Sequence, residues 1–340
     1  MGIKDLNKFL RKYCNNTAIR CIQMKELSGK KIAVDISIYM YKYAGDDTLI
    51  ENIYLMLSMF RYYNITPIFV FDGKPPTEKK SLLQKRRENK REAEKEYNRL
   101  QSLLTSASME ETNIDNEDKQ EIINNMDILK KQFVYINNET ITLVKELIRS
   151  HGMTYYDAHG EADELCALLV MKNKVWACLS EDMDMFVYGC PRVLRYISLM
   201  NHTMVLYDTN EILKMLGVTE KELREICVLS GTDYHSHIHK NTSENTKTLH
   251  KTLKLFKKYH NENVKNQTVP QQNFYNWLLE KTNYIEDYDL LIKIYKMFDL
   301  NENHEHMKVF ENIRIINGPI YQDKINNILK TDGFLFPENE

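Results

Sequence analysis

The sequence predicts an α/β protein with a mostly parallel central sheet and helices on both of its faces. Three short runs have the continuous apolar, β-branched character of strands buried on both sides: 31–34, 67–71 and 175–179. Helical patterns separate these runs along the chain, chiefly at 36–63, 136–150 and 163–172. Strands that alternate with helices form parallel sheets, because each helix returns the chain to the same end of the sheet.

The composition is that of an ordinary soluble globular protein. The chain has 340 residues, of which 43% are hydrophobic and 28% charged, enough for one large or two moderate domains. A net charge of −2 means that overall charge does not indicate nucleic-acid binding. No apolar run of about 18 residues occurs, so no membrane span is expected. The N-terminus, MGIKDLNKFLRKYC, has no long apolar stretch, so no secretory signal is expected. Six cysteines without a CxxC pair predict an intracellular, reducing compartment.

Acidic residues follow all three predicted strands. Asp35 ends the first run, Asp72 follows the second, and Asp182 and Asp184 follow the third. A further pair, Glu161 and Asp163, begins a predicted helix. Ligands of parallel sheets bind beyond the carboxyl ends of the strands. A single aspartate there often starts a turn or caps a helix. Clustered carboxylates instead repel one another unless a cation gathers them, and Mg²⁺ prefers such oxygens, so the whole set predicts a metal site.

A strongly charged insertion, 77–135, follows the second strand. It begins as a long helix over about 77–104, in which Lys79, Arg86 and Lys90 share one face. The acidic, polar stretch 101–127 predicts a flexible loop between two helices. A solvated helix with its own ion pairs is the alternative. We expect a mobile cap over the acidic site, with a basic face that suits an anionic substrate.

The pattern changes after the third strand. Residues 193–206 predict an antiparallel strand pair at the sheet edge, and helices then run to the sequence GTDY, which places Asp233 at a helix exit. Three alternating histidines follow: His235, His237 and His239. Zinc binding is an alternative for them, but no cysteine or further histidine pattern supports it, and we predict an exposed polar loop.

A basic amphipathic helix is predicted at 246–260. Four lysines form one stripe along it: Lys247, Lys251, Lys254 and Lys258. Such a stripe suits successive phosphates of a nucleic-acid backbone, a contact that is independent of sequence and sensitive to salt. A solubilising face is the alternative. Further helices are predicted at 274–279, 288–298 and 320–329.

Six motifs occur in one order over about residues 1–240: MGIKDL, AVDIS, FVFDGKPP, GEADELCA, SEDMDMFVYG and LSGTDY. With them the chain resembles the flap endonuclease family of structure-specific 5′ nucleases, which is related to the excision-repair 3′-side nuclease. The resemblance implies a PIN-like 5′-nuclease fold with a helical arch and a C-terminal helical DNA-binding region. It divides the chain into a nuclease region (1–76), the arch (77–135), a second nuclease region (136–234) and the DNA-binding region (235–340).

The resemblance also implies a site with two Mg²⁺ ions, for which Mn²⁺ is expected to substitute. The acids matching one ion's site are Asp35, Asp72, Glu161 and Asp163. Those matching the other are Asp182, Asp184 and Asp233. Lys79 and Arg86 match catalytic cations that steer the scissile phosphate, Tyr41 matches an aromatic that stacks on the unpaired base, and Gly2 matches a residue whose backbone lies beside the site. Hydrolysis would leave a 5′-phosphate and a 3′-hydroxyl.

The implied function is a 5′ flap endonuclease and 5′→3′ exonuclease acting on DNA in replication and repair. The alternatives are a Holliday-junction, gap or excision-repair nuclease of the same superfamily, a 5′→3′ exoribonuclease, and a non-catalytic nucleic-acid-binding relative. The long cap suits the threading of single strands, and the motifs FDGKPP and GTDY match the DNA enzymes better. Seven retained carboxylates argue against a non-catalytic protein, because clustered charge is unfavourable without a metal.

The sequence also departs from the family pattern. Asp163 stands where the family commonly has glutamate, which leaves a contribution from Glu164 open. The stretch 235–254 contains no glycine, so the family's potassium site is not expected. Four C-terminal residues have the spacing of a sliding-clamp peptide but lack its aromatic pair, so clamp binding is not expected: Gln322, Ile325, Ile328 and Leu329. We expect a monomer that binds branched or flapped DNA, in a nucleus or at a viral replication site.

Overall fold

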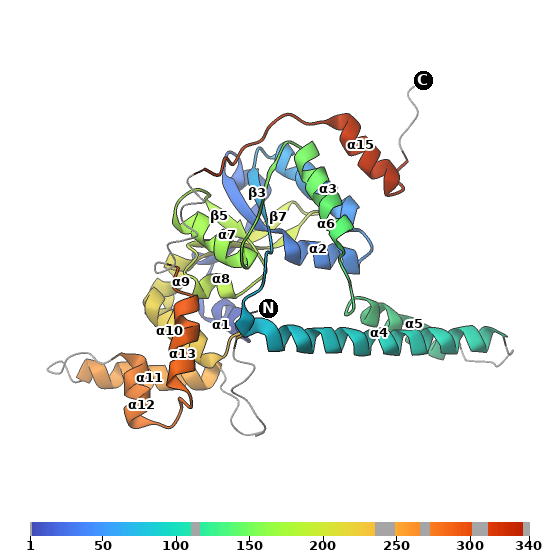
Figure 1. Cartoon of the computed structure of the whole chain (residues 1–340). Helices are drawn as coiled ribbons and strands as arrows, with labels where there is room; N and C mark the ends of the chain where they lie inside the picture. The colour runs from blue at the N-terminus through green and yellow to red at the C-terminus, as the bar shows by residue number, and fades with distance from the viewer. Residues whose placement is uncertain (1, 110–115, 235–248, 266–272, 301–311, 336–340) are drawn as a thin grey trace.

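The computed structural model describes residues 2–109, 116–234, 249–265, 273–300 and 312–335. Within these ranges a seven-stranded sheet has the order β1-β7-β6-β5-β2-β3-β4, with helices on both faces (Figure 1). The strands are β1 (Ile19–Gln23), β2 (Lys31–Asp35), β3 (Thr66–Phe71), β4 (Thr154–Asp157), β5 (Ala177–Leu179), β6 (Arg192–Ser198) and β7 (Thr203–Asp208).

The α-helices of the described ranges are α1 (Leu6–Tyr13), α2 (Ile36–Gly45), α3 (Leu49–Tyr62), α4 (Lys80–Met109), α5 (Asn116–Lys130), α6 (Asn138–Ser150), α7 (Ala162–Met171), α8 (Asp184–Val187), α9 (Thr209–Leu216), α10 (Glu220–Ser230), α11 (Leu249–Lys265), α12 (Phe274–Lys281), α13 (Tyr288–Met297) and α15 (Gln322–Thr331). Two short 3₁₀ helices, η1 (Met24–Leu27) and η2 (Thr77–Lys79), precede β2 and α4. None of these helices is long and apolar enough to cross a lipid bilayer.

The sheet is mostly parallel, as the sequence predicts. Strands β4, β3, β2, β5 and β6 run parallel, and β7 is antiparallel to β6, which confirms the expected antiparallel pair. The sheet edge beyond β7 is β1, which the sequence pattern did not reveal because only two of its five residues are buried. The three strands predicted from apolar runs lie side by side as β3, β2 and β5.

A hydrophobic core lies on each face of the sheet. Alternate residues of β2 divide between them: Ala33 belongs to one core, and Ile32 and Val34 belong to the other. The first core packs beneath α1, α7 and α10, and the second beneath α2, α3 and α6. Burial on both faces explains why these strands are continuously apolar in sequence.

Within the predicted arch region, 77–135, α4 and α5 lie side by side and project from the body (Figure 1). The prediction of a flexible loop over 101–127 is wrong, because α4 continues to Met109 and α5 begins at Asn116. Polar composition suggested a loop, but the segment is also rich in helix-forming residues and the two helices support each other. Tyr97 of α4 contacts Phe133, just after α5, with ring centroids 5.3 Å apart.

Two other helical predictions need adjustment. The stretch 36–63 forms two helices, interrupted by a turn in which Asp47 has a φ of 55°. The C-terminal helix α15 packs on α6, where Ile325, Ile328 and Leu329 are buried in the core. The predicted helix at 246–260 is present as α11, and its apolar residues Leu249 and Phe256 are buried.

Candidate metal centre

Asp35 and Asp72 come from neighbouring parallel strands. Asp35 is the last residue of β2, and Asp72 directly follows β3. The chain after β3 then passes close to the chain before α7: the Gly73 N–H donates to the Gly160 carbonyl at 2.7 Å. A Cβ on Gly73 would lie 1.9 Å from the Ala158 carbonyl oxygen, so this approach requires glycine. It brings Asp72 to the start of α7.

The start of α7 supplies two further acids. Glu161 immediately precedes the helix and Asp163 lies in its first turn. The Ala162 N–H donates to Asp72 Oδ1 at 2.9 Å, so a carboxylate from β3 caps α7. A helix N-terminus favours negative charge nearby, which lowers the cost of gathering these three acids.

The chain after β5 adds Asp182 and Asp184, and a serine ties them to β2. Ser180 Oγ donates to Asp35 Oδ2 at 2.9 Å and accepts from the Asp182 N–H at 3.1 Å. The Asp184 N–H donates to Asp182 Oδ1 at 2.9 Å. The backbone of Gly2 lies against both acids: with φ at 74°, a Cβ there would sit 2.4 Å from Oδ1 of each.

Two cations from the base of the arch meet these acids. Lys79 Nζ lies 2.7 Å from a Glu161 carboxylate oxygen, and Arg86 lies 2.8 Å from Asp233, beyond the end of α10. Tyr234 donates its hydroxyl to the same Glu161 at 2.7 Å, and its ring centroid is 4.8 Å from Lys79 Nζ. The seven predicted metal ligands and both predicted catalytic cations therefore lie near one another around the carboxyl ends of β2, β3 and β5, joined by pairwise contacts.

Burial and mutual repulsion shift the pKa values of the acids. Burial, with the charges of Asp72 and Asp182, raises the pKa of Asp35 to about 8, although Ser180 opposes the shift. Burial and nearby acids also raise the pKa of Asp163 and Asp184 well above the ordinary range. Buried carboxyl groups with raised pKa values are suited to binding a cation, because a nearby divalent ion would favour their ionised form and lower those pKa values.

The charge of Lys79 reflects the same surroundings. Burial alone would lower the pKa of Lys79, but Glu161 and Asp163 outweigh it and raise that pKa above its usual value. Lys79 is therefore held as a buried cation among the acids. Its partner and that of Arg86 are both predicted metal ligands, so these two cations neutralise part of the site.

The donor set fits a hard divalent cation. Asp184 Oδ1 is buried and has no hydrogen-bond partner among the described residues, which is the state of a ligand atom directed at an ion. All seven candidate ligands are carboxylates, the donors that Mg²⁺ and Mn²⁺ prefer. In the described part of the chain, no three acidic, histidine or cysteine side chains already converge as a formed metal site. Glu161 and Asp233 are paired with Lys79 and Arg86, so an ion at either acid would compete with these cations.

The remaining predicted site residues lie on the surface. Tyr41, on α2, is 47% exposed, and its ring centroid is 4.8 Å from Lys90 Nζ of α4. Three of the predicted stripe lysines are exposed on α11: Lys251, Lys254 and Lys258. The fourth, Lys247, and the three alternating histidines lie outside the described residues, as does much of the stretch considered for potassium.

Two residues beside the cluster were not singled out from the sequence. Ser180 orients Asp35, and Tyr234 holds Glu161. Both belong to motifs already noted, SEDMD and GTDY, so their adjacency to predicted ligands was the available signal. The sequence pattern could not tell that their side chains face inward.

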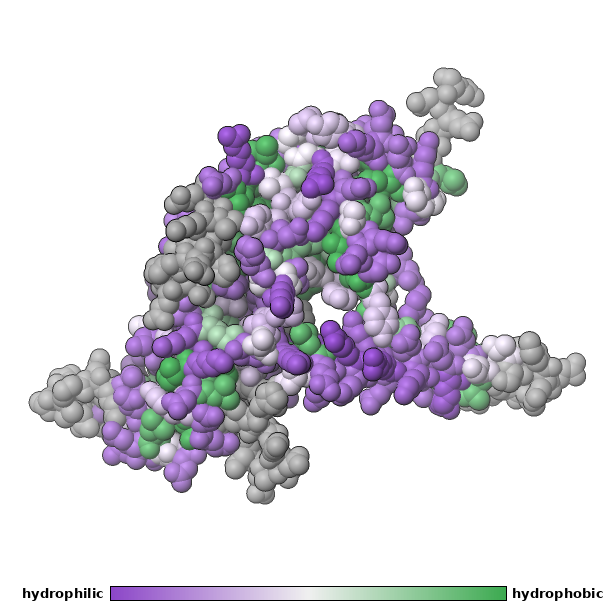
Figure 2. Space-filling view, in the orientation of Figure 1, coloured by the Kyte–Doolittle hydropathy of each residue, from purple (hydrophilic) through white to green (hydrophobic). Residues whose placement is uncertain are grey.

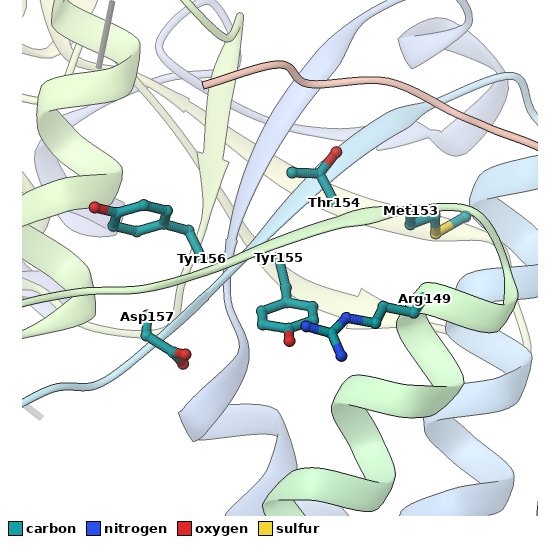
Figure 3. A pocket seen from close by; sticks show the side chains of 6 residues that line it. All are labelled: Arg149, Met153, Thr154, Tyr155, Tyr156 and Asp157. Carbon is teal, nitrogen blue, oxygen red and sulfur yellow. The ribbon is translucent and has the colours of Figure 1, made fainter. Parts of the chain in front are cut away.

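A recess of about 500 Å³ lies apart from these acids, on β4 (Figure 3). Arg149 and Asp157 are its charged lining residues, and the Arg149 guanidinium carbon is 4.8 Å from the ring centroid of Tyr155. None of the seven clustered carboxylates lines it. The recess is therefore separate from the candidate metal centre.

Two family models match the chain over slightly more than half its length: the XPG N-terminal domain at residues 1–93 and the XPG I-region at residues 152–233. Flap endonuclease 1 of Brugia malayi is 31% identical over 257 residues, which are 70% of this chain and 63% of the relative. Flap endonuclease 1 of Xenopus tropicalis is 30% identical over 252 residues, 69% of this chain and 61% of the relative. The chain thus spans less than two thirds of the length of these relatives.

Solved structures agree on the fold. The catalytic core of Rad2 in complex with DNA substrate is 21% identical, with a TM-score of 0.62 over 98% of this chain and 94% of that one. Flap endonuclease-1 from Methanococcus jannaschii is also 21% identical, with a TM-score of 0.51 over 92% of this chain and 94% of that one. Human GEN1 in complex with Holliday junction DNA is 16% identical, with a TM-score of 0.57 over 97% and 73%. By its two matched domains and its curated relatives, this chain belongs to the XPG family of flap endonucleases.

Proposed function

We propose that this protein is a structure-specific 5′ flap endonuclease with 5′→3′ exonuclease activity, which hydrolyses DNA phosphodiesters with two bound Mg²⁺ ions. One observation supports the proposal: seven carboxylates lie around the carboxyl ends of parallel strands, and two of them pair with Lys79 and Arg86 of the predicted arch region. Membership of the flap endonuclease family supports it. The match covers less than two thirds of these relatives, so their activity is extended to this chain as a proposal.

The seven acids divide into two ligand sets. Asp35, Asp72, Glu161 and Asp163 would hold one ion, and Asp182, Asp184 and Asp233 the other; Mn²⁺ is expected to replace Mg²⁺. When bound, such ions lower the pKa of a water molecule and stabilise the charge on the attacked phosphate and the leaving oxygen. Asp163 is one methylene shorter than a glutamate would be, so its reach toward an ion is reduced.

The chain's own residues prepare the site. Ser180 fixes the orientation of Asp35, and the absence of a side chain at Gly2 lets the backbone lie against Asp182 and Asp184. Lys79 and Arg86 enter from the arch side, where a substrate phosphate must approach. We propose that both would leave these carboxylates to contact the scissile phosphate.

The surroundings suit a strand that is partly unpaired. Tyr41 stands beside the acids, where its ring would stack on an unpaired base, and the α11 lysines would contact duplex phosphates. We propose flapped or branched DNA as the partner of a monomeric enzyme. An intracellular, reducing compartment is also proposed, in keeping with six free thiols, all of them among the described residues.

A substrate panel tests the function. The full chain is incubated with end-labelled flap, nicked, four-way-junction and RNA substrates, with Mg²⁺ or with EDTA. We expect cleavage at the flap base with Mg²⁺, none with EDTA, and weaker cleavage of the other substrates. Preferred cutting of the four-way junction or of RNA would replace the flap assignment, and equal cleavage in EDTA would remove the metal-dependent mechanism.

A further inference from the structure

Lys90 Nζ lies over two tyrosine rings near the base of the arch. It is 4.8 Å from the ring centroid of Tyr41 and 5.3 Å from that of Tyr135. The three residues come from three different elements: α2, α4 and the segment that connects α5 to α6. Lys90 Nζ also donates to the Val134 carbonyl at 2.7 Å, so this lysine connects α4 to the segment between α5 and α6.

Both rings remain open to solvent. Tyr41 is 47% exposed and Tyr135 is 60% exposed, so neither serves the hydrophobic core. The Tyr135 hydroxyl donates to Glu94 of α4 at 3.1 Å, which orients the ring from the arch side. Two exposed aromatic rings that share one ammonium group offer surfaces on which a ligand can stack.

Tyr41 lies near the metal centre. Burial and the negative charge of Asp72 raise the pKa of Tyr41, so the Tyr41 phenol lies within electrostatic range of that carboxylate. A gap separates α4 from the body in the space-filling view (Figure 2). An unpaired strand that reaches the acids under the arch would therefore pass the two tyrosines.

We propose that Tyr41 and Tyr135 together clamp one unpaired base, and that Lys90 occupies the base's place beside the rings when DNA is absent. Stacked aromatic pairs have ring centroids about 4.5–7 Å apart, and the Lys90 ammonium sits within this range from both rings. On entry of the base, Lys90 would move to an adjoining phosphate, where its charge is better compensated. This inference rests on the proposed function of the same site.

The test uses flap DNA with 2-aminopurine as the first unpaired nucleotide, bound to the full chain carrying Asp182→Ala to prevent cleavage. Stacking quenches this fluorophore, and we expect binding to quench it severalfold. Adding Tyr135→Leu should remove at least half of the quenching, whereas Tyr135→Phe, which keeps the ring but loses the bond to Glu94, should retain it. Tyr62→Leu, at an 80% exposed tyrosine on α3, is the matched control and should change nothing.

A kinetic measurement gives the second readout. With Asp182 intact, Tyr135→Leu should lower the single-turnover cleavage rate by about tenfold, the scale of losing one base stack, while the Kd for flap DNA changes less than about threefold. Unchanged quenching in Tyr135→Leu would overturn the clamp. So would an equal loss in Tyr135→Phe, which would assign the effect to the Glu94 bond. Failure of the proposed function appears separately, as absent Mg²⁺-dependent flap cleavage by the unmodified chain.

Discussion

Lys79 Nζ lies 2.7 Å from a carboxylate oxygen of Glu161, inside the cluster of acids predicted to bind metal. An ammonium group therefore stands where a divalent ion would be expected to act, and it keeps the metal-free site from carrying an excess of buried negative charge. The cation that is proposed to meet the substrate phosphate is thus also the one that neutralises Glu161. We propose that metal binding and the release of Lys79 are linked.

The Lys79→Ala substitution should destabilise the protein in the absence of metal, and Mg²⁺ should raise the Tm of this variant by more than it raises that of the unmodified protein. Loss of one partner of a buried ion pair costs about 3 kcal/mol, because Glu161 is left unpaired. Thermal unfolding in EDTA and then in Mg²⁺ measures both effects, and the Mg²⁺-induced rise in Tm should exceed that of the unmodified protein. Lys293→Ala, which breaks the exposed pair with Glu78 at the same end of the arch, is the control and should cost less than about 1 kcal/mol. Equal effects of the two substitutions would contradict a special role for Lys79.

Asp182→Ala should reduce flap cleavage by about a thousandfold or more, since it removes a proposed metal ligand, and leave the Kd for flap DNA within about threefold. The variant should unfold in EDTA at a Tm no lower than that of the unmodified protein, because Asp182 adds to the repulsion felt by Asp35, Asp163 and Asp184. Asp157→Ala is the matched control: it also removes an aspartate at a strand end, but Asp157 pairs with Lys145 outside the cluster. Near-normal cleavage by Asp182→Ala would refute the assignment of the site.

Gly2→Ala should lower the cleavage rate by at least about tenfold. The new methyl group would overlap an oxygen of both Asp182 and Asp184, so the chain end or the two acids must shift. Gly29→Ala separates this clash from backbone strain, since Gly29 has nearly the same φ, 73°, with nothing within 4 Å of the added atom. We expect Gly29→Ala to lower stability by about 1 kcal/mol and leave the cleavage rate unchanged. A matching loss of rate in both variants would make strain, and not the clash, the cause.

The stability of the protein in EDTA should depend on pH because Asp35 titrates. Its pKa is raised from 3.8 to about 8, so the folded protein retains a proton that the unfolded chain loses. Stability therefore falls as the pH rises from about 4 to about 8, by an amount on the order of 5 kcal/mol for a fully buried group. Asp35→Asn removes this dependence and should raise Tm at pH 8, by roughly 5 °C, but hardly at pH 4. A Tm difference that is independent of pH would show that Asp35 does not titrate in this range.

The exposed lysines of α11 should act on duplex DNA through charge alone. The double variant Lys254→Ala/Lys258→Ala should weaken binding equally for different sequences and reduce the slope of log K against log salt by about 2. The measurement is a titration of duplex DNA by fluorescence anisotropy at several salt concentrations. A double variant of exposed lysines on α15, Lys324→Ala/Lys330→Ala, has the same change in net charge and should leave the slope unchanged. Similar slopes for the two variants would move the duplex contact away from α11.

The acids of the site could be found from local sequence because each follows a recognisable strand or opens a helix. Three apolar runs ending at Asp35, Asp72 and the Asp182 pair imply one sheet edge, since parallel strands place their carboxyl ends together. Asp233 needed the resemblance to a known family, as no strand precedes it. The flexible loop expected at 101–127 shows where composition misleads: charged, polar residues are compatible with a pair of helices that support each other.

The partners of these residues depend on packing between distant parts of the chain. Lys79 and Glu161 are 82 positions apart, and Arg86 and Asp233 are 147 apart. The periodicity of a sequence does not predict which charged side chain on a helix face will pair with which acid. The pairing depends on how α4 is placed relative to the sheet. The same holds for Tyr135, which carries no sequence signal and lies near Lys90 and Glu94 of α4 because the chain after α5 folds back onto that helix. Local sequence patterns therefore identify the chemical groups of the site, and tertiary contacts decide which groups pair. Hydrogen bonds and ion pairs depend on distances of a few ångströms in space and not on separation along the chain.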